Sequence, residues 1–535
     1  MRKLLVGAVI GALAISSTAY AKGGEPYDVG DGKPIGRSSI MNGPNGVYVS
    51  PVDGNVYAAS VIGSEITVHD PLTGELLDRI GSERGVYGPD DLVIAPDGTL
   101  YWTELIGGNV GMLKPDGTWR TQFVAPGVNP ITLSDDGRLF VALDFLGDGL
   151  YELDPELTAP PQVIIPDLVG FNGMDFGPDG LLYGPLFFGG AIARIDVDAA
   201  VPAPEIVATG FRVPGAVAFS PDGELYAVDF AEGQVVRVDV GSGATEVMAD
   251  IDGVLDNLAF GADGTLFTTG FADGQLLTLT PGSQLRALVQ GGFIAPGGVA
   301  VDDDGSVWVA DFFSIREMQS SRDPVTSWYD RFDAPGTGPA SANTIDASGD
   351  HLITTGWFSN SVQVLDRTDG SIVEDIRNLA LPVNAIDHGG VLAVSQLGAA
   401  NVVDGRTGDV LLDGLAYPLG LASDGDTLYV GDWALGDVWA VPSGAAPSRL
   451  AAGLANPEGM TVDGDRLLVV EQGAGRVSAV DLATGAVTPV ITGLALGDAA
   501  VPGGVPHGVV SSVDTAADFI YATSDIDNAV YRFKR

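Results

Sequence analysis

A short pattern of residues recurs twelve times along this chain, at intervals of about 40 residues. Each copy has an alternating apolar run, an Asp-Gly or similar turn and a second apolar run, as in the segment from Pro214 to Asp229. Asp-Gly between two apolar runs is the strongest short-range signal for a β-hairpin. The period is typical of β-propeller blades, which are four-stranded antiparallel sheets. The copies begin at Pro44, Pro89, Val128, Phe171, Pro214, Leu255, Pro296, Ala342, Val383, Pro418, Pro457 and Pro506.

Twelve blades exceed the roughly four to eight of one ring. The sequence therefore predicts an all-β protein of twelve four-stranded blades, arranged as tandem six-bladed β-propellers. We expect an N-terminal extension at 22–42, a first propeller at 43–291 and a second at 292–535. Residues 23–42 are expected to add an outer strand to the first ring. The last copy ends at its third strand, and residues 284–290 are the candidate for its missing outer strand.

The first 21 residues have the features of a secretory signal peptide. Arg2 and Lys3 precede an apolar run at 4–15, and Ala19-Tyr20-Ala21 fits the cleavage pattern. A membrane anchor is the weaker alternative, because the run is shorter than the ~20 residues that span a bilayer. We therefore expect a periplasmic or extracellular protein whose mature chain starts near Lys22 and has no membrane span.

Charge and cysteine content exclude several function classes. The chain has no cysteine, so disulfides and thiol catalysis are excluded. The 70 acids and 26 bases give a net charge of −44, which makes nucleic acid and anionic membranes poor partners. Many aspartates fall in Asp-Gly turns, so general solubility explains the acidity more simply than a specific cationic partner does.

The residue just before each innermost strand should point into the funnel at one end of the propeller axis. We call the residues around this funnel the hub. In the first ring, five of the six hub positions carry carboxylate or amide oxygens, the ligands that hard cations prefer. The alternative is that Asn, Asp and Gly merely tolerate the turn geometry there. We expect Ca²⁺, with Mg²⁺ or Zn²⁺ as alternatives. The six residues are Asn45, Asp90, Asn129, Asn172, Gly215 and Asp256.

The second ring has a less regular hub. Its candidate ligands are Asn343, Asn384 and Glu458, whereas Gly297 and Leu419 interrupt the set. His507 occupies the last hub position and is a candidate general base or ligand; a hydrogen-bonded structural histidine is the alternative. Acids also recur at the ends of the second strands, where recurrence favours structural bonds to loop amides. They are Glu104, Asp144, Asp229, Asp311, Asp432, Glu471 and Asp525.

Several segments resemble a known propeller superfamily. The segment from Phe171 to Gly180 and the Gly88–Asp91 segment resemble metal-ligand strands of the senescence-marker-protein, gluconolactonase and strictosidine-synthase-like proteins. Asp256-Asn257 is similar to a pair in the paraoxonase-like branch, and 108–117 resembles NHL and virginiamycin B lyase repeats. The resemblance implies a hub cation that activates a lactone or ester for hydrolysis. Asn45 departs from it, because the family usually has glutamate there, and the lyase's histidine pair is not matched.

Two functions remain open at this point. The first is an exported metal-dependent hydrolase of lactones or similar esters, with Asn129, Asn172 and Asp256 as ligands and Asp90 as ligand or base. Its catalytic candidates are Asp90, Asp256 and His507. The second is a non-catalytic recognition or scaffold protein that binds a protein or glycan, with a structural cation or none. An open funnel over the hub favours the enzyme, and a plugged one favours the scaffold.

Overall fold

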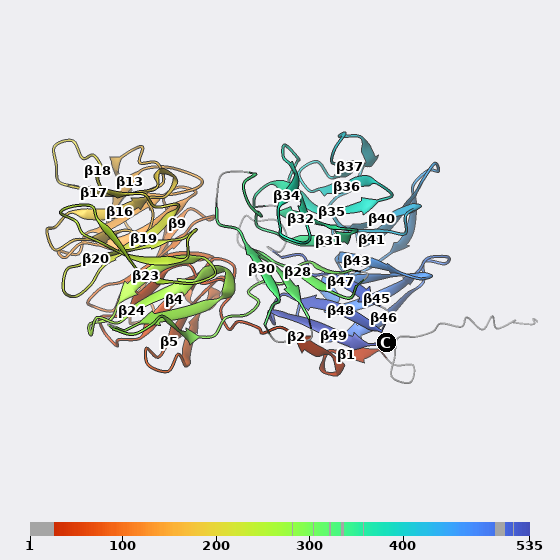
Figure 1. Cartoon of the computed structure of the whole chain (residues 1–535), viewed down its shortest axis with the longest axis horizontal. Coiled ribbons are helices and arrows are strands. Elements are labelled where there is room, and N and C mark those ends of the chain that lie inside the picture. The colour runs from red at the N-terminus through yellow and green to blue at the C-terminus, as the bar shows by residue number, and fades with distance from the viewer. Residues whose placement is uncertain are drawn as a thin grey trace, which may run out of the picture.

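The computed structural model describes residues 26–280, 282–302, 304–319, 323–332, 336–356, 358–497, 509–516 and 518–535. These residues form twelve sheets of antiparallel strands in two rings, which confirms the predicted tandem six-bladed propellers (Figure 1). Within these ranges the helices are single 3₁₀ turns, and none is long and apolar enough to cross a membrane. The proposed signal peptide, 1–21, and His507 lie outside the described residues.

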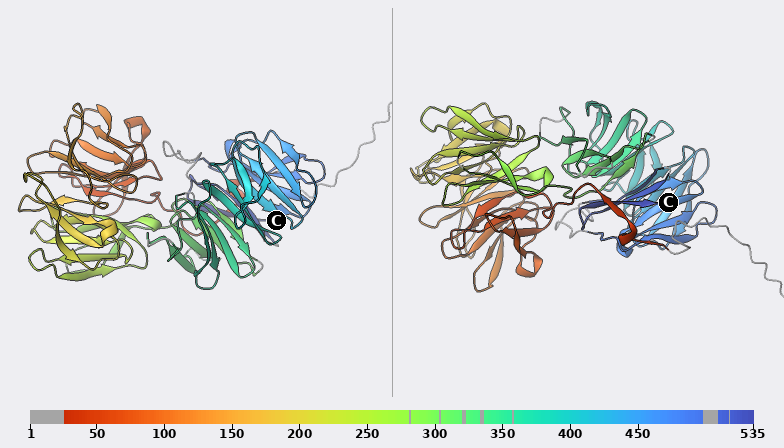
Figure 2. Two further views of the ribbon diagram at one scale, coloured as in Figure 1. Left: turned by 90° about the horizontal axis from the view of Figure 1, so that it is seen from above. Right: turned by 60° about the horizontal axis from the view of Figure 1, so that its bottom comes forward.

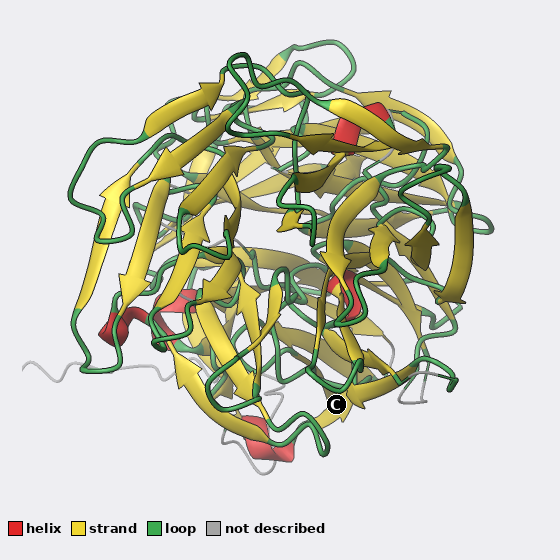
Figure 3. Ribbon diagram, turned by 90° about the vertical axis from the view of Figure 1, so that its left-hand side faces the viewer, coloured by secondary structure: helices red, strands yellow, loops and turns green. Residues whose placement is uncertain are grey.

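In the first propeller every blade takes its four strands from consecutive chain segments. Strands and loops make up almost all of the described chain (Figure 3). The hairpin turns contain glycines with positive φ, such as Gly98 at +87° and Gly223 at +81°, a conformation that side chains disfavour. The strands are β3–β6 (Val47–Val49, Val56–Ser60, Glu65–His69, Leu76–Ile80), β7–β10 (Pro89–Ile94, Leu100–Glu104, Asn109–Leu113, Trp119–Phe123), β11–β14 (Val128–Leu133, Leu139–Leu143, Leu150–Leu153, Gln162–Ile165), β15–β18 (Asp175–Phe176, Leu182–Leu186, Ala191–Ile195, Glu205–Thr209), β19–β22 (Pro214–Phe219, Leu225–Asp229, Gln234–Val238, Thr245–Asp250) and β23–β26 (Leu255–Phe260, Leu266–Gly270, Gln275–Leu279, Arg286–Val289).

In the second propeller the first five blades are built in the same way, and the last chain segment supplies three strands to the sixth. The strands are β27–β30 (Val299–Val301, Val307–Asp311, Ser314–Met318, Thr326–Tyr329), β31–β34 (Thr344–Ser348, His351–Gly356, Ser361–Asp366, Ile372–Ile376), β35–β38 (Pro382–His388, Val391–Gln396, Asn401–Asp404, Val410–Leu412), β39–β42 (Pro418–Ser423, Thr427–Asp432, Asp437–Pro442, Ser448–Ala452), β43–β46 (Pro457–Asp463, Arg466–Glu471, Arg476–Asp481, Val487–Thr492) and β47–β49 (Val513–Ala516, Phe519–Ser524, Ala529–Lys534).

The N-terminal segment closes the second ring, so its predicted pairing with the first ring is wrong. Strand β2 (Lys33–Ile35) pairs antiparallel with β49, and β1 (Tyr27–Asp28) pairs parallel with β46 (Figure 2). The predicted outer strand at 284–290 is also wrong, because β26 completes the sixth blade. The physical reason is that each copy in the first ring already has four strands, whereas β49 leaves a free edge.

Five of the seven acids near the ends of the second strands bond backbone amides of the loops between blades, as predicted; Glu104 instead accepts from the side chains of Trp102 and Asn109, and Asp144 accepts the amide of Phe145. The carboxylate of Asp229 accepts bonds from the amides of Arg212 and Val213, at 2.7 and 3.1 Å. Asp432 accepts the amides of Ala416 and Tyr417 at 2.7 and 3.1 Å. These bonds satisfy loop donors that would otherwise be buried without partners, and they fix where each innermost strand begins.

The two propellers share a packed, charged contact. Arg316 of β29 lies 2.9 Å from Asp273 of the first propeller and 3.0 Å from Asp311. The hydroxyl of Tyr329 bonds Asp273 at 3.2 Å. Arg331 donates to the backbone carbonyls of Ala231 and Gly253 across the same contact. The contact lies at the mouth of the first propeller and positions the second propeller's loops over its hub.

Candidate hub site

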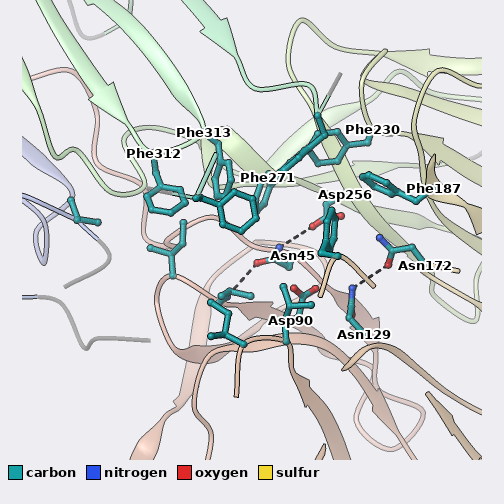
Figure 4. A pocket seen from close by; sticks show the side chains of 18 residues that line it. Asn45, Asp90, Asn129, Asn172, Phe187, Phe230, Asp256, Phe271, Phe312 and Phe313 are labelled. Carbon is teal, nitrogen blue, oxygen red and sulfur yellow. Dashed lines mark hydrogen bonds between the residues drawn. The ribbon is translucent and has the colours of Figure 1, made fainter. Parts of the chain in front are cut away.

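Five side chains predicted at the first hub come together around one pocket (Figure 4). We call them the hub ring. Each belongs to a different blade and stands at or just before the start of an innermost strand. The repeat therefore places them at equivalent points about the axis, with Gly215 at the sixth position. They are Asn45, Asp90, Asn129, Asn172 and Asp256.

Two hydrogen bonds join neighbouring members of the hub ring. The side-chain amide of Asn45 donates to a carboxylate oxygen of Asp256 at 3.1 Å, which connects the first and sixth blades. The amide of Asn129 donates to Oδ1 of Asn172 at 3.1 Å, which connects the third and fourth. Both amide groups thus have their nitrogens turned toward a neighbouring oxygen.

Asp90 differs from the other four members. Its side chain is 7% exposed, and its carboxylate accepts no hydrogen bond from the described residues. Burial raises its pKa well above the usual value, and the charge of Asp256 raises it further. Burial also raises the pKa of Asp256 to about 7, partly opposed by the bond from Asn45. The two groups therefore share a site that disfavours two negative charges.

The hub ring fits a hard divalent cation in donor type and charge. It offers two carboxylates and three amide groups, and none of the described residues that line the pocket is Lys, Arg or His. A cation would neutralise the charge that Asp90 and Asp256 otherwise bear without a basic partner. Across the described part of the chain, no three acid or histidine side chains converge on one metal-sized point, so the amides of the hub ring are needed as ligands.

A second, apolar ring surrounds the pocket above the hub ring, and sequence reasoning missed it. Five of the six blades contribute the residue that directly follows their second strand, and the third blade contributes the second residue after β12. The signal was available, because this position carries an apolar residue in every copy of the first propeller. The six residues are Val61, Leu105, Phe145, Phe187, Phe230 and Phe271.

Four phenylalanines of the second propeller cover this pocket, and we call them the phenylalanine roof: Phe312, Phe313, Phe332 and Phe358. The rings of Phe313 and Phe271 are 4.3 Å apart across the contact between the propellers. The cavity that remains has a volume of about 80 Å³. The funnel is therefore neither open nor plugged: it is a small chamber with a polar floor and an apolar upper part.

Three phenylalanines of the chamber have left-handed backbone conformations. The φ angles of Phe145, Phe312 and Phe332 are +55°, +52° and +50°. A bulky side chain in this region costs about 1–3 kcal/mol and clusters at functional sites. The surrounding packing must therefore stabilise these conformations, which aim aromatic rings at the pocket instead of into a blade.

The described hub candidates of the second ring have different surroundings. Asn343 and Glu458 are buried, at 2% and 1% exposure, and Asn384 lines a separate pocket with Asp346 and Asp387. One oxygen of Glu458 accepts the amide of Ser511 at 2.9 Å, and the other has no hydrogen-bond partner among the described residues. Burial raises the pKa of Glu458 well above its usual value. His507 lies outside the described residues.

The chain was compared with known proteins. No protein-family model matches it, and no curated protein is similar to it in sequence. Solved structures of single propellers are similar in fold at low identity. A streptogramin B lyase is 19% identical, with 52% of this chain and 94% of that chain covered and a TM-score of 0.39. A gluconolactonase from Xanthomonas campestris is 15% identical, with 49% and 91% covered and a TM-score of 0.40.

A calcium-binding regucalcin from Agrobacterium tumefaciens is also similar, at 15% identity, with 46% of this chain and 85% of that chain covered and a TM-score of 0.36. Each of these three proteins corresponds to about half of the present chain. At these values the similarity carries no argument, and the activity has to be argued from the hub site itself.

Proposed function

We propose that this chain is an exported, metal-dependent hydrolase of lactones or similar esters, and that it acts at the hub of the first propeller. The observation that carries the proposal is the Asp90 carboxylate, which is buried, has no hydrogen-bond donor among the described residues and stands beside Asp256. Buried acids without basic partners are rare unless they hold a cation or exchange a proton. Both roles are needed in a metal-assisted hydrolysis.

Each member of the hub ring has a role in this proposal. Asp90, Asp256 and the oxygens of Asn129 and Asn172 hold the cation, with Asn45 orienting Asp256 through its 3.1 Å bond. A divalent cation held there would supply Lewis-acid polarisation of the substrate carbonyl. Asp90, whose carboxylate is buried and has no hydrogen-bond donor among the described residues, would be the group that accepts a proton from the attacking water. The apolar ring keeps bulk water from the reacting carbon.

Metal analysis combined with a lactone and ester panel tests the proposal. We expect the purified protein to hold about one divalent cation per chain and to lose turnover in chelator. Asp90→Asn should lose turnover by at least ~100-fold, the size of a lost acid–base group. Glu458→Gln is the matched control, because it alters a buried acid of the other ring, and it should retain activity. Turnover that survives both chelation and Asp90→Asn would refute the proposal.

One observation favours the second candidate, a non-catalytic recognition protein. The phenylalanine roof covers the hub and leaves a cavity of only about 80 Å³, which suits a rigid joint between two propellers. Under this alternative the cation is structural, and the outer faces of the blades bind a protein or glycan. A chain that retains its cation, melts earlier in chelator and turns over no lactone or ester supports this candidate.

A further inference from the structure

We infer that the second propeller completes the hub site, and that the site takes an uncharged lactone or ester that carries a compact apolar substituent on the carbon bonded to its ring or alkoxy oxygen. This inference rests on the proposed function and specifies its substrate. The floor of the chamber is polar, and the walls and roof are almost wholly apolar (Figure 4). A ligand that fits both parts must itself be polar at one end and apolar at the other.

The roof is built around Phe332, which lies at the centre of the aromatic cluster. Its ring centroid is 5.1 Å from that of Phe230 and 5.9 Å from that of Phe145, both in the first propeller. It is also 6.0 Å from Phe313 and 6.2 Å from Phe358, within the roof. A single side chain of the second propeller therefore contacts the apolar walls that the first propeller provides.

The segment that carries Phe332 is fixed at both propellers. Arg331 donates to the carbonyls of Ala231 and Gly253 in the first propeller. Asp330 accepts the amide of Phe332 at 2.9 Å and that of Ser341 at 2.8 Å. These bonds hold Phe332 in its left-handed conformation, with φ of +50°. The hydrogen bonds of Asp330 and Arg331 thus fix the position of Phe332 in the roof. Chance packing of exposed rings would not require these bonds.

Among the residues that the structure describes, those lining the upper chamber offer hydroxyl groups no side-chain partners. The ring and roof residues Phe187, Phe230, Phe271, Phe312 and Phe313 present only carbon atoms to the pocket. A buried hydroxyl without a hydrogen bond is strongly disfavoured, so a sugar lactone with several hydroxyls fits poorly. The volume of about 80 Å³ has to hold the reacting group as well as its substituent. We therefore expect a substituent of at most about four carbons.

Binding of non-hydrolysable analogues tests the inference independently of turnover. The probes are γ-lactams with hydrogen, methyl, ethyl, propyl or butyl at the ring carbon beside nitrogen, titrated calorimetrically into the full chain with and without added Ca²⁺. Each methylene that enters the chamber should tighten binding about fourfold. The gain should end by butyl. The five γ-lactones with the same substituents, and glucono-δ-lactone, are assayed for hydrolysis in parallel.

Two roof variants locate the gain. Phe358→Ala changes a ring that is 38% exposed, so its folding risk is low, and Phe332→Ala removes the central ring. Both substitutions should abolish most of the gain in affinity between the unsubstituted lactam and the propyl lactam. The affinity for the unsubstituted lactam should stay unchanged. Phe123→Ala, on an exposed outer strand at 61% exposure, is the control and should behave as the parent chain.

The outcomes separate the two proposals. If lactam affinity rises with chain length but no lactone is hydrolysed, the result supports the apolar chamber and refutes the hydrolase. Hydrolysis of glucono-δ-lactone at least as fast as that of the alkyl lactones overturns the inference and leaves the hydrolase intact. Lactam affinity that is undetectable or flat with chain length, or that both roof variants lower equally for all five probes, also overturns the inference.

Discussion

The side-chain amide of Asn45 donates to the carboxylate of Asp256 at 3.1 Å, across the point where the first and last blades of the first propeller meet. The two residues are 211 positions apart in the chain. The bond therefore closes the ring of blades and also places Asp256 beside Asp90 in the pocket. Asn45 thus takes part in the assembly of the candidate cation site and in ring closure, where its backbone carbonyl also accepts the Thr269 hydroxyl at 2.6 Å.

Stability without metal should rise as the pH falls from 8 to about 5. Burial raises the pKa values of Asp91, Asp144 and Asp256 to about 7, above those of an unfolded chain. The folded state therefore binds more protons than the unfolded state over this range, and lower pH favours folding. Melting temperatures measured by calorimetry in chelator from pH 8 to pH 5 check this. Added Ca²⁺ should flatten the profile, and a melting temperature that falls across this interval would contradict it.

Asp90→Asn should stabilise the metal-free protein at pH 8. The substitution replaces a buried charge that has no donor with a neutral group of the same shape. We expect a gain of about 1–3 kcal/mol in the free energy of unfolding of the first propeller. Urea denaturation in chelator measures it. In saturating Ca²⁺ the parent chain should instead be the more stable protein, because the variant lacks a ligand. Equal stability of both proteins in both conditions would mean that Asp90 faces no cation.

The blades and the hub ring could be read from the sequence because both follow from one local register. Asp90 and Asn172 stand at the same offset from their turn aspartates, so a repeat of strands places them around one axis. The apolar ring obeys an equally local rule, and Phe187, Phe230 and Phe271 could have been found in the same way. It was missed because an apolar residue after a strand is ordinarily assigned to the core.

Other features had no local signal. The roof depends on how one propeller packs against the other, and the segment around Phe332 carries no repeat pattern that relates it to the first hub. Strand β2 is three residues long, and what selects its partner is the free edge of β49, almost 500 residues away. Contacts of this kind depend on the assembled blades, which a short stretch of sequence does not describe.

Ile35→Ala should weaken the second propeller. Ile35 of β2 is 6% exposed and packs in a cluster with Val530 and Tyr521, where it seals the last blade. Loss of a buried isoleucine side chain costs about 2–5 kcal/mol. Ile40→Ala is the control, because Ile40 is 42% exposed, and its effect should stay within about 0.5 kcal/mol. Calorimetry should show the loss of stability in the unfolding transition of the second propeller only. An equal effect of both substitutions would argue that β2 does not close this propeller.

Arg316→Ala should destabilise the contact between the propellers more than any exposed ion pair does. The guanidinium lies 2.9 Å from Asp273 and 3.0 Å from Asp311, and its side chain is 5% exposed. Breaking a buried pair leaves an uncompensated charge and costs about 3–5 kcal/mol. Arg237→Ala, which breaks exposed pairs with Glu224 and Glu246, is the control and should cost at most about 1 kcal/mol.

The cost of Arg316→Ala should also depend on pH, with a definite sign. Burial raises the pKa of Asp311 to about 6 even though Arg316 opposes the shift, so without the arginine the pKa should rise further. Asp311 would then be neutral at pH 5 and charged at pH 8, and the variant should lose less stability at pH 5. Urea midpoints at the two pH values measure the difference. A loss that is the same at both would show that packing of the arginine stem, and not its charge, stabilises the contact.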